Sequence, residues 1–553
     1  MPLPRAESVG VYGRKGVELA LRQIAQAPEQ RSARKLAAGH GAAETDPEGS
    51  GAGKKVLILT PRDWAAHVQY EGVIAQALRL RGASVEFLTC GGGLEVCDRA
   101  NTYESPPMPC RTCTRYVEKS VDAHGFPRSA IRDGWERNDP LPWPELDEIS
   151  RADLGTVTAE GQPLGALIEI PLKWFLCSAD IDEDPLAGQM GRAFLRSARR
   201  IVHGVTAALD RLEPDVVLLC NGLFLFESIA WSLCRQRGID VVTYERAFLK
   251  ETLVFHRGAP AGLYDLSDEW ARADRPLTES EERQITEYLD QRRHGKAFDQ
   301  FWQFRQEGVA AHSGRMATLF TNLTWDTAVI GRDRAFPDIR AWIAAAIEAF
   351  ARRPDDRLVI RVHPSELRLP GKITRDSLGD YIREHWPVLP ANVILVGSED
   401  LQSSYELMDA SDVGLVYSST AGLEMALSGR PVIVAGETHY RGKGFTVDVT
   451  SPEDFRGALD RILDDPAAMR PDVDQARRYA HFFFFRAPIR APFVVEPLPG
   501  LARITTEKLT DLAPGHHADL DRICTGILEG ASFVDEASGP DEVEVWPAVG
   551  GDN

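Results

Sequence analysis

Two short stretches of this sequence combine polar side chains that could bind a phosphate group. Arg361-Val362-His363-Pro364 ends one short apolar run, and Ser418-Ser419-Thr420 follows another. Each run predicts a strand of a parallel sheet, and the carboxyl ends of such strands form one edge where ligands bind. The guanidinium of Arg361 could neutralise a phosphate, and His363 could donate a hydrogen bond to it. We therefore predict that both stretches line one site.

Each stretch also has an interpretation without a ligand. A His-Pro dipeptide is expected about once by chance in a chain with these His and Pro counts, so His363 could be a hydrogen-bonded histidine at a strand end. Ser and Thr are common N-caps of helices, and Glu424 stands near a first turn, where acidic residues are favoured. The sequence alone leaves binding and capping both open.

Three more polar residues follow predicted strands. Asn322 ends the strand 318–322, Asp63 lies just after the strand 56–60, and Glu245 follows the strand 240–244. A carboxylate at such an edge could act as a general base on a hydroxyl group. Glu245 is the first candidate and Asp63 the second, although either could be a plain loop carboxylate, and Asn322 could be a turn residue.

Strands and helices alternate along both halves of the chain, and this order positions the candidate residues. The predicted strands are 56–60, 84–89, 216–220 and 240–244 in the first half, and 318–322, 357–362, 392–396, 413–417 and 431–435 in the second. Such alternation is typical of α/β folds with parallel sheets. Its repetition predicts two Rossmann-like domains facing across a cleft, which is the glycosyltransferase-B (GT-B) architecture.

The predicted boundaries divide the chain into four parts. We expect an N-terminal helix and flexible linker at 1–54, the first Rossmann-like domain at 55–300, the second at 301–495, and a C-terminal extension with an acidic tail at 496–553. Residues 90–150 are rich in Pro and Cys and interrupt the α/β pattern, so we interpret them as an insertion in the first domain.

The composition excludes some classes of protein. A chain of 553 residues with 43% hydrophobic and 26% charged residues is typical of a soluble protein with at least two domains. A net charge of −19 argues against non-specific binding to nucleic acid. No signal peptide or membrane-spanning run is evident, so we expect a cytoplasmic protein, with peripheral membrane contact left open.

Four of the eight cysteines lie close together in the predicted insertion: Cys90, Cys97, Cys110 and Cys113. The spacing of the last two is that of half a zinc knuckle, whereas the first two are further apart than in most structural zinc sites. A structural zinc that orders the insertion, a redox pair and plain free thiols are the alternatives. We expect no metal to be required for catalysis, because Arg, His and backbone N–H groups could stabilise a leaving phosphate.

The second half of the chain resembles the capsule-polysaccharide-biosynthesis family, which includes Kdo transferases. The similar segments are the Arg361–Pro364 stretch, Tyr417 to Glu424, and Gly429 to Thr446, with weaker similarity at Asn221-Gly222 and at 244–252 in the first half. The resemblance spans roughly residues 190–490. It departs from the family at 90–150, which has no counterpart, and at Arg246, where a glycine is common.

The resemblance implies a glycosyltransferase that moves a sugar, Kdo-like in the family, from a CMP-linked donor to a surface or capsular glycan or glycolipid. The donor phosphate would be bound by Arg361, His363 and the Ser418–Thr420 turn. The hydroxyl groups of the donor would be bound by Glu424 and Asn322. The first domain would hold the acceptor, with Glu245 or Asp63 as the base. A CDP-polyol phosphotransferase, a sugar-nucleotide epimerase and a non-catalytic assembly or export factor are the alternatives.

Overall fold

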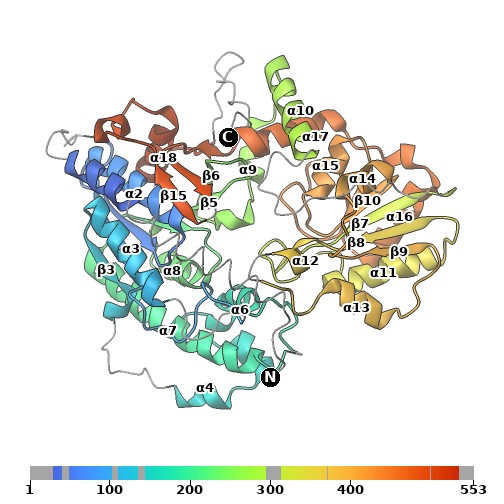
Figure 1. The fold of residues 1–553 in the computed structure, drawn as a ribbon, viewed down its shortest axis with the longest axis horizontal. Helices are drawn as coiled ribbons and strands as arrows, with labels where there is room; N and C mark the ends of the chain where they lie inside the picture. The colour runs from blue at the N-terminus through green and yellow to red at the C-terminus, as the bar shows by residue number, and fades with distance from the viewer. Residues whose placement is uncertain are drawn as a thin grey trace. The chain divides into compact units, whose positions relative to one another are not determined.

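The computed structural model describes residues 29–39, 49–102, 110–134, 143–182, 184–293, 313–369, 372–498 and 500–534. The chain divides into two compact units, each with its own sheet (Figure 1). Unit 1 comprises residues 1–176, 181–264 and 488–534, and unit 2 comprises 177–180, 265–487 and 535–553. The N-terminal helix predicted before residue 29 and the acidic tail after 534 lie outside the described residues.

Unit 1 contains a seven-stranded sheet in the order β13-β6-β5-β4-β1-β2-β3. Strands β1 to β5 run parallel, and β6 and β13 are antiparallel to their neighbours. The strands are β1 (Lys55–Thr60), β2 (Ser84–Thr89), β3 (Arg128–Ala130), β4 (Val216–Cys220), β5 (Asp240–Arg246), β6 (Thr252–Arg257) and β13 (Ile489–Arg490).

Helices cover both faces of this sheet, which explains why its central strands are apolar along their whole length. Val56 and Ile58 of β1 pack with α2 (Ala65–Leu80), α3 (Cys110–His124) and α18 (Ala518–Glu529). Their neighbours Leu57 and Leu59 point to the other face and pack with α6 (Glu169–Leu176), α7 (Ala187–Leu212) and α8 (Leu225–Gln236). Successive strand residues thus alternate between two cores.

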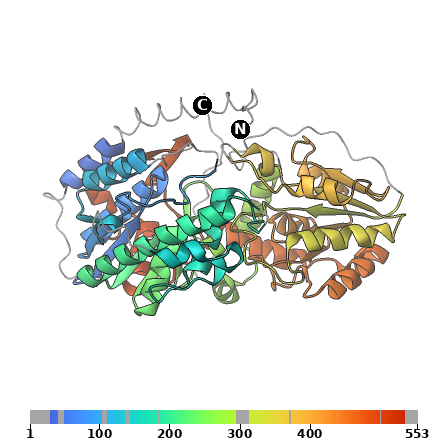
Figure 2. The ribbon, with the colours of Figure 1, turned by 90° about the horizontal axis from the view of Figure 1, so that it is seen from below.

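Unit 2 contains a six-stranded, all-parallel sheet in the order β12-β11-β10-β7-β8-β9. The strands are β7 (Met316–Phe320), β8 (Arg357–Arg361), β9 (Val393–Val396), β10 (Val413–Val416), β11 (Val432–Val434) and β12 (Val447–Asp448). The apolar residues of β7, β8, β10 and β11 form one core with α11 (Ile339–Ala351), α13 (Leu378–His385) and α16 (Pro452–Asp464). The ribbons of these helices lie alongside the sheet (Figures 1 and 2).

The remaining helices of unit 2 include α9 (Ser267–Ala273), α10 (Glu279–Arg293), α12 (Ser365–Arg368), α14 (Ser404–Ala410), α15 (Ala421–Leu427) and α17 (Val473–His481). The helix α17 continues into a π-helical turn at Phe482–Arg486. The predicted α/β class with two Rossmann-like units is confirmed by these sheets.

Two parts of the chain, the predicted insertion and the predicted C-terminal extension, contribute helices and strands to unit 1 that the sequence pattern did not predict. Within the predicted insertion, α3 packs in the core of unit 1 and β3 adds a strand to its sheet. After unit 2, residues 488–534 return to unit 1, where β13 pairs with β6 and α18 joins the core. The hairpin of β14 (Val494–Leu498) and β15 (Leu501–Ile504) belongs to the same segment. Among the described helices, none has the length and apolarity needed to cross a membrane.

Candidate functional site

The order of strands in unit 2 marks one point on its sheet where ligands of α/β proteins bind. The chain proceeds from β7 to β8 and β9 on one side, and from β10 to β11 and β12 on the other. The connections after β7 and β10 therefore leave in opposite directions, and the crevice that this creates lies at their carboxyl ends. At this point Asn322 follows β7 and its Oδ1 accepts a hydrogen bond from the backbone N–H of Ser418, at 3.4 Å.

His363 lies on the neighbouring strand end and is held firmly there. Its backbone N–H donates to Oγ1 of Thr321, after β7, at 2.9 Å. Its ring Nδ1 accepts the backbone N–H of Ser365 at 3.2 Å. Because Nδ1 is an acceptor, the neutral ring carries its proton on Nε2. The imidazole therefore has an N–H donor at this edge of the sheet.

The charge state of His363 follows from its surroundings. Burial lowers its pKa to about 4; nearby Asp326 opposes this shift and Arg361 adds to it. The ring is therefore neutral at pH 7 and acts as a hydrogen-bond donor rather than as a cation. The structure thus brings together three predicted strand ends, those of Asn322, His363 and Ser418.

The turn at Ser418–Thr420 is only partly explained by helix capping. The Oγ of Ser419 accepts the N–H of Ala421 at 3.3 Å, as a cap would. Thr420 makes no side-chain cap of α15. The Oγ of Ser418 is buried, in a residue that is 8% exposed, and has no hydrogen-bond partner among the described residues. A buried hydroxyl without a partner is costly, so a ligand or water at this position would satisfy it.

Arg361 has a different environment from the predicted one. It is only 1% exposed, and its guanidinium donates to the backbone carbonyls of Gly397 at 2.6 Å, Asp400 at 3.2 Å and Gln402 at 3.1 Å. These bonds fix the segment that follows β9. The phosphate contact of Arg361 stays a prediction; in the structure this guanidinium binds backbone carbonyls and its charge acts on nearby His363.

The carboxylate of Glu424 forms an ion pair with Arg292. Its Oε1 accepts from Nη2 of Arg292 at 2.6 Å and from Nε at 3.1 Å, and both residues are buried. This ion pair joins α15 to α10. The contact of Glu424 with donor hydroxyls stays a prediction; in the structure its carboxylate joins two helices of unit 2.

The loop after β11 belongs to the Gly429 to Thr446 segment that resembles the family, and it contains several polar residues. Tyr440 donates through its hydroxyl to the carbonyl of Ser419 at 2.5 Å, so the loop lies against the Ser418–Thr420 turn. The ring of His439 stacks on Phe483 with the centroids 3.8 Å apart. The Gly-rich pattern from Gly436 to Gly444 was the available signal, but it does not show which side chains are held in place.

Unit 1 has an equivalent crevice, between β1 and β4, where the chain order reverses in the same way. Glu245 lies half-buried beside it, at the end of β5. One carboxylate oxygen accepts from Nδ2 of Asn221, and the other accepts the backbone N–H of Arg246 at 2.7 Å. Burial raises the pKa of Glu245, and these two hydrogen bonds oppose the shift. The carboxylate is thus oriented and made more basic, as a general base requires.

Asn221 holds Glu245 through an unusual backbone conformation. Its φ of +59° lies in the left-handed region that non-glycine residues rarely adopt. The adjacent Gly262 leaves space for the amide, since a Cβ there would lie 2.5 Å from Nδ2. Strained residues of this kind are often found at functional sites.

Asp63, the second predicted base, is engaged in a double ion pair. Both of its oxygens accept from Arg99, one from Nε and the other from Nη2 at 3.2 Å. The structure therefore favours Glu245 over Asp63 as the candidate base of unit 1.

The buried acid Glu71 lies next to the carboxyl end of β1 in unit 1. Glu71 is 2% exposed and accepts hydrogen bonds from the hydroxyl groups of Thr60 and, at 2.7 Å, Tyr244. Burial raises its pKa to about 8, although both hydroxyl groups act in the opposite direction. Nearby, Arg62 is held by Asp98 and Glu227. Sequence reasoning missed Glu71 because it lies inside a helix rather than at a strand end.

This acid predicts a pH-dependent stability. Between the ordinary glutamate pKa of 4.5 and the raised value of about 8, the folded protein retains the Glu71 proton whereas the unfolded chain releases it, so stability falls as pH rises through this window. We expect the free energy of unfolding of Glu71→Gln, relative to that of the wild type, to be higher at pH 9 than at pH 5 by on the order of a few kcal/mol. Urea unfolding at both pH values measures it. The exposed Glu384→Gln is the control, and a Glu71→Gln difference independent of pH would contradict the assignment.

The predicted cysteine cluster forms no evident metal centre. Cys90, Cys97 and Cys113 are buried and all four thiols are free. Burial raises the pKa of Cys97 and Cys113 well above the usual value. In the part of the chain that the structure describes, no group of three or more His, Cys, Asp or Glu residues is arranged to hold a metal ion.

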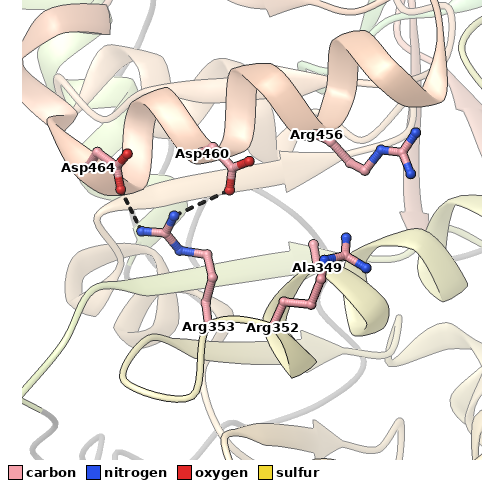
Figure 3. Close-up of a pocket in the computed structure, with 6 residues that line it drawn as sticks. All are labelled: Ala349, Arg352, Arg353, Arg456, Asp460 and Asp464. Atoms are coloured by element: carbon pink, nitrogen blue, oxygen red, sulfur yellow. Dashed lines mark hydrogen bonds and ion pairs between the residues drawn. The ribbon is translucent and has the colours of Figure 1, made fainter.

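A cavity of about 380 Å³ lies elsewhere in unit 2, between the end of α11 and α16 (Figure 3). It is lined by Ala349, Arg352, Arg353, Arg456, Asp460 and Asp464. Arg353 spans it, with ion pairs to Asp464 at 2.7 Å and Asp460 at 3.3 Å. Because α11 leads into the start of β8, the cavity lies at the amino ends of the strands. This is the opposite edge from His363 and Ser418, and the ion pairs explain the cavity as a link between two helices.

Comparison with known proteins supports the predicted family. Residues 283–472 match the family model described as capsule polysaccharide biosynthesis protein. This segment contains the site residues Asn322, His363 and Ser418. The resemblance to that family is thereby confirmed for this part of the chain. A sequence comparison with curated proteins finds no match.

The solved structures that match this chain have low sequence identity to it. The Kdo 2,4 transferase KpsC of Thermosulfurimonas dismutans is 16% identical, with a TM-score of 0.34, over 54% of this chain and 87% of that one. A UDP-GlcNAc 2-epimerase from Neisseria meningitidis is 11% identical, with a TM-score of 0.25, over 77% and 97%. Likeness at this level carries no argument about activity.

Proposed function

We propose that this chain is a glycosyltransferase that moves a Kdo-like sugar from a CMP-linked donor to a surface or capsular glycan or glycolipid. The observation that carries this proposal is the arrangement of His363, Asn322 and Ser418 at the switch point of the unit 2 sheet. The family match over the same residues supports it.

The donor phosphate would bind at this edge of unit 2. The Nε2–H of His363 and the Oγ of Ser418 would donate to its oxygens, with Thr420 and Ser419 beside them. When the bond between the sugar carbon and the phosphate oxygen breaks, negative charge accumulates on the phosphate. Fixed N–H and O–H donors stabilise such charge without reorganising, and this chemistry requires no metal ion.

Glu245 of unit 1 would accept the proton of the acceptor hydroxyl as its oxygen bonds to the sugar carbon. The products are the extended glycan and CMP. Asn221 keeps the carboxylate in position, and burial keeps it basic enough for the proton transfer.

The experiment that tests the proposal follows a labelled sugar from CMP-, UDP- and CDP-linked donors onto glycan acceptors. We expect transfer from a CMP-linked sugar, with release of CMP. Transfer of a polyol phosphate from a CDP-linked donor, or epimerisation of a UDP-sugar, would replace the proposal by the corresponding alternative. Nucleotide binding without any turnover would favour a non-catalytic role.

A further inference from the structure

The ring of His439, in the loop after β11, is fixed by three aromatic neighbours. It stacks on Phe483 with an interplanar angle of 9°, and Tyr440 meets it edge-on. Its Nδ1 lies 2.9 Å from the hydroxyl oxygen of Tyr479. The same hydroxyl lies 2.6 Å from the backbone carbonyl of His439. The ring therefore cannot reorient without breaking these contacts.

These contacts determine where the ring proton lies. A carbonyl can only accept, so the hydroxyl of Tyr479 donates its single proton to the carbonyl of His439. The Nδ1 of His439 must then be the donor to the hydroxyl oxygen. The neutral ring consequently has a lone pair on Nε2, and burial, with Arg332 and Lys443 nearby, lowers its pKa to about 3 and keeps it neutral.

The Nε2 lone pair is buried and has no hydrogen-bond partner among the residues that the structure describes. An acceptor in this situation is costly unless a ligand or a water molecule donates to it. Its polarity is opposite to that of His363, whose Nε2 carries a proton. The neutral ring of His363 therefore offers a hydrogen-bond donor at Nε2, and that of His439 offers an acceptor.

The position of His439 indicates which part of a nucleotide this would be. It precedes Tyr440, whose hydroxyl donates to the carbonyl of Ser419 at 2.5 Å, so the loop that carries His439 contacts the turn after β10. The hydroxyl of Ser418, like the Nε2 of His439, has no partner in the described chain. In a nucleotide the group next to the phosphate is the ribose, and its hydroxyl groups are hydrogen-bond donors.

We propose that His439 accepts a hydrogen bond from a ribose hydroxyl of the donor nucleotide and so selects ribonucleotides over deoxyribonucleotides. This inference rests on the proposed function, since it takes the nucleotide to bind at this edge of unit 2. It assigns the recognition of ribose hydroxyl groups to His439 as well as to Glu424, whose Oε1 is bound by Arg292.

The test measures binding of CMP, 2′-deoxy-CMP and 2′,3′-dideoxy-CMP to the full chain by calorimetry. We expect the wild type to bind the dideoxy analogue about 3- to 10-fold more weakly than CMP. His439→Phe keeps the stack on Phe483 and removes the lone pair, so it should bind the analogues and CMP equally. His439→Gln, which retains an acceptor, should restore part of the difference. The exposed His385→Phe is the matched control and should behave as the wild type.

The outcomes separate this inference from the proposed function. If the wild type binds all three nucleotides equally, the lone pair is satisfied by water and the inference is wrong, while nucleotide binding stands. If no nucleotide binds, both are overturned. If His439→Phe melts far below the wild type, His439→Gln decides: weaker binding of the dideoxy analogue than of CMP by this variant supports the inference, and equal binding contradicts it.

Discussion

Replacing His363 by alanine is expected to lower the rate of sugar transfer by about 100- to 1000-fold, the usual cost of removing one donor to a developing negative charge. The N–H on Nε2 would stabilise the leaving phosphate, and nothing else at this strand end carries an equivalent donor in our proposal. Steady-state rates with the donor identified in the transfer assay measure the effect.

Two comparisons distinguish this role from a structural one. His363→Gln places an N–H donor near the same position and should recover part of the loss, whereas His385→Ala, on the exposed side of α13, should have no effect. Because burial lowers the pKa of His363 to about 4, the wild-type rate should show no loss of activity at pH 6 to 7 from this group. Full activity of His363→Ala would remove the imidazole from the mechanism.

Replacing Glu245 by glutamine is expected to lower the rate of transfer by about 100- to 10,000-fold, because the amide cannot accept the proton of the acceptor hydroxyl. The change is isosteric and keeps an acceptor for the N–H of Arg246. Since burial raises the pKa of Glu245, the wild-type rate should rise with pH as this carboxyl loses its proton, and the variant should lack that rise. Rates measured across the acidic pH range test both statements.

Asp63→Asn is the matched control for Glu245→Gln. Asp63 is bound on both oxygens by Arg99, so its replacement should affect stability more than the rate of transfer. The opposite result, a large loss in Asp63→Asn and little change in Glu245→Gln, would exchange the roles that we propose for the two carboxylates. Donor binding should be unaffected in both variants, because both residues belong to unit 1.

The strand ends of both sheets could be predicted from the sequence because their signals are local. Short apolar runs that end in polar residues place Asn322, His363 and Ser418 at one edge, and parallel pairing then brings them together without further information. The same reasoning located Glu245. Its partner Asn221 was noted only for its similarity to the family, since its left-handed backbone is not visible in the sequence.

The structural partners of Arg361 and Glu424 could not be predicted because they are distant in the sequence. Glu424 lies in a nucleotide-sugar-like pattern, but Arg292, more than a hundred residues earlier, occupies it. Arg361 has the residue type and position of a phosphate ligand, yet the carbonyls after β9 take up its donors. Nothing local indicated that residues 488–534 return to unit 1, since that depends on the pairing of β13 with β6. Long-range contacts of this kind decide which polar residues are available to a ligand.

Calorimetric titration of CMP into the wild type, His363→Ala and Ser418→Ala tests most directly whether the carboxyl edge of the unit 2 sheet binds an activated nucleotide. We predict that the wild type binds CMP more tightly than cytidine, and that each variant loses most of this preference for the phosphate. CMP and cytidine binding with equal affinity to the wild type, or phosphate preference unchanged in both variants, would contradict the account.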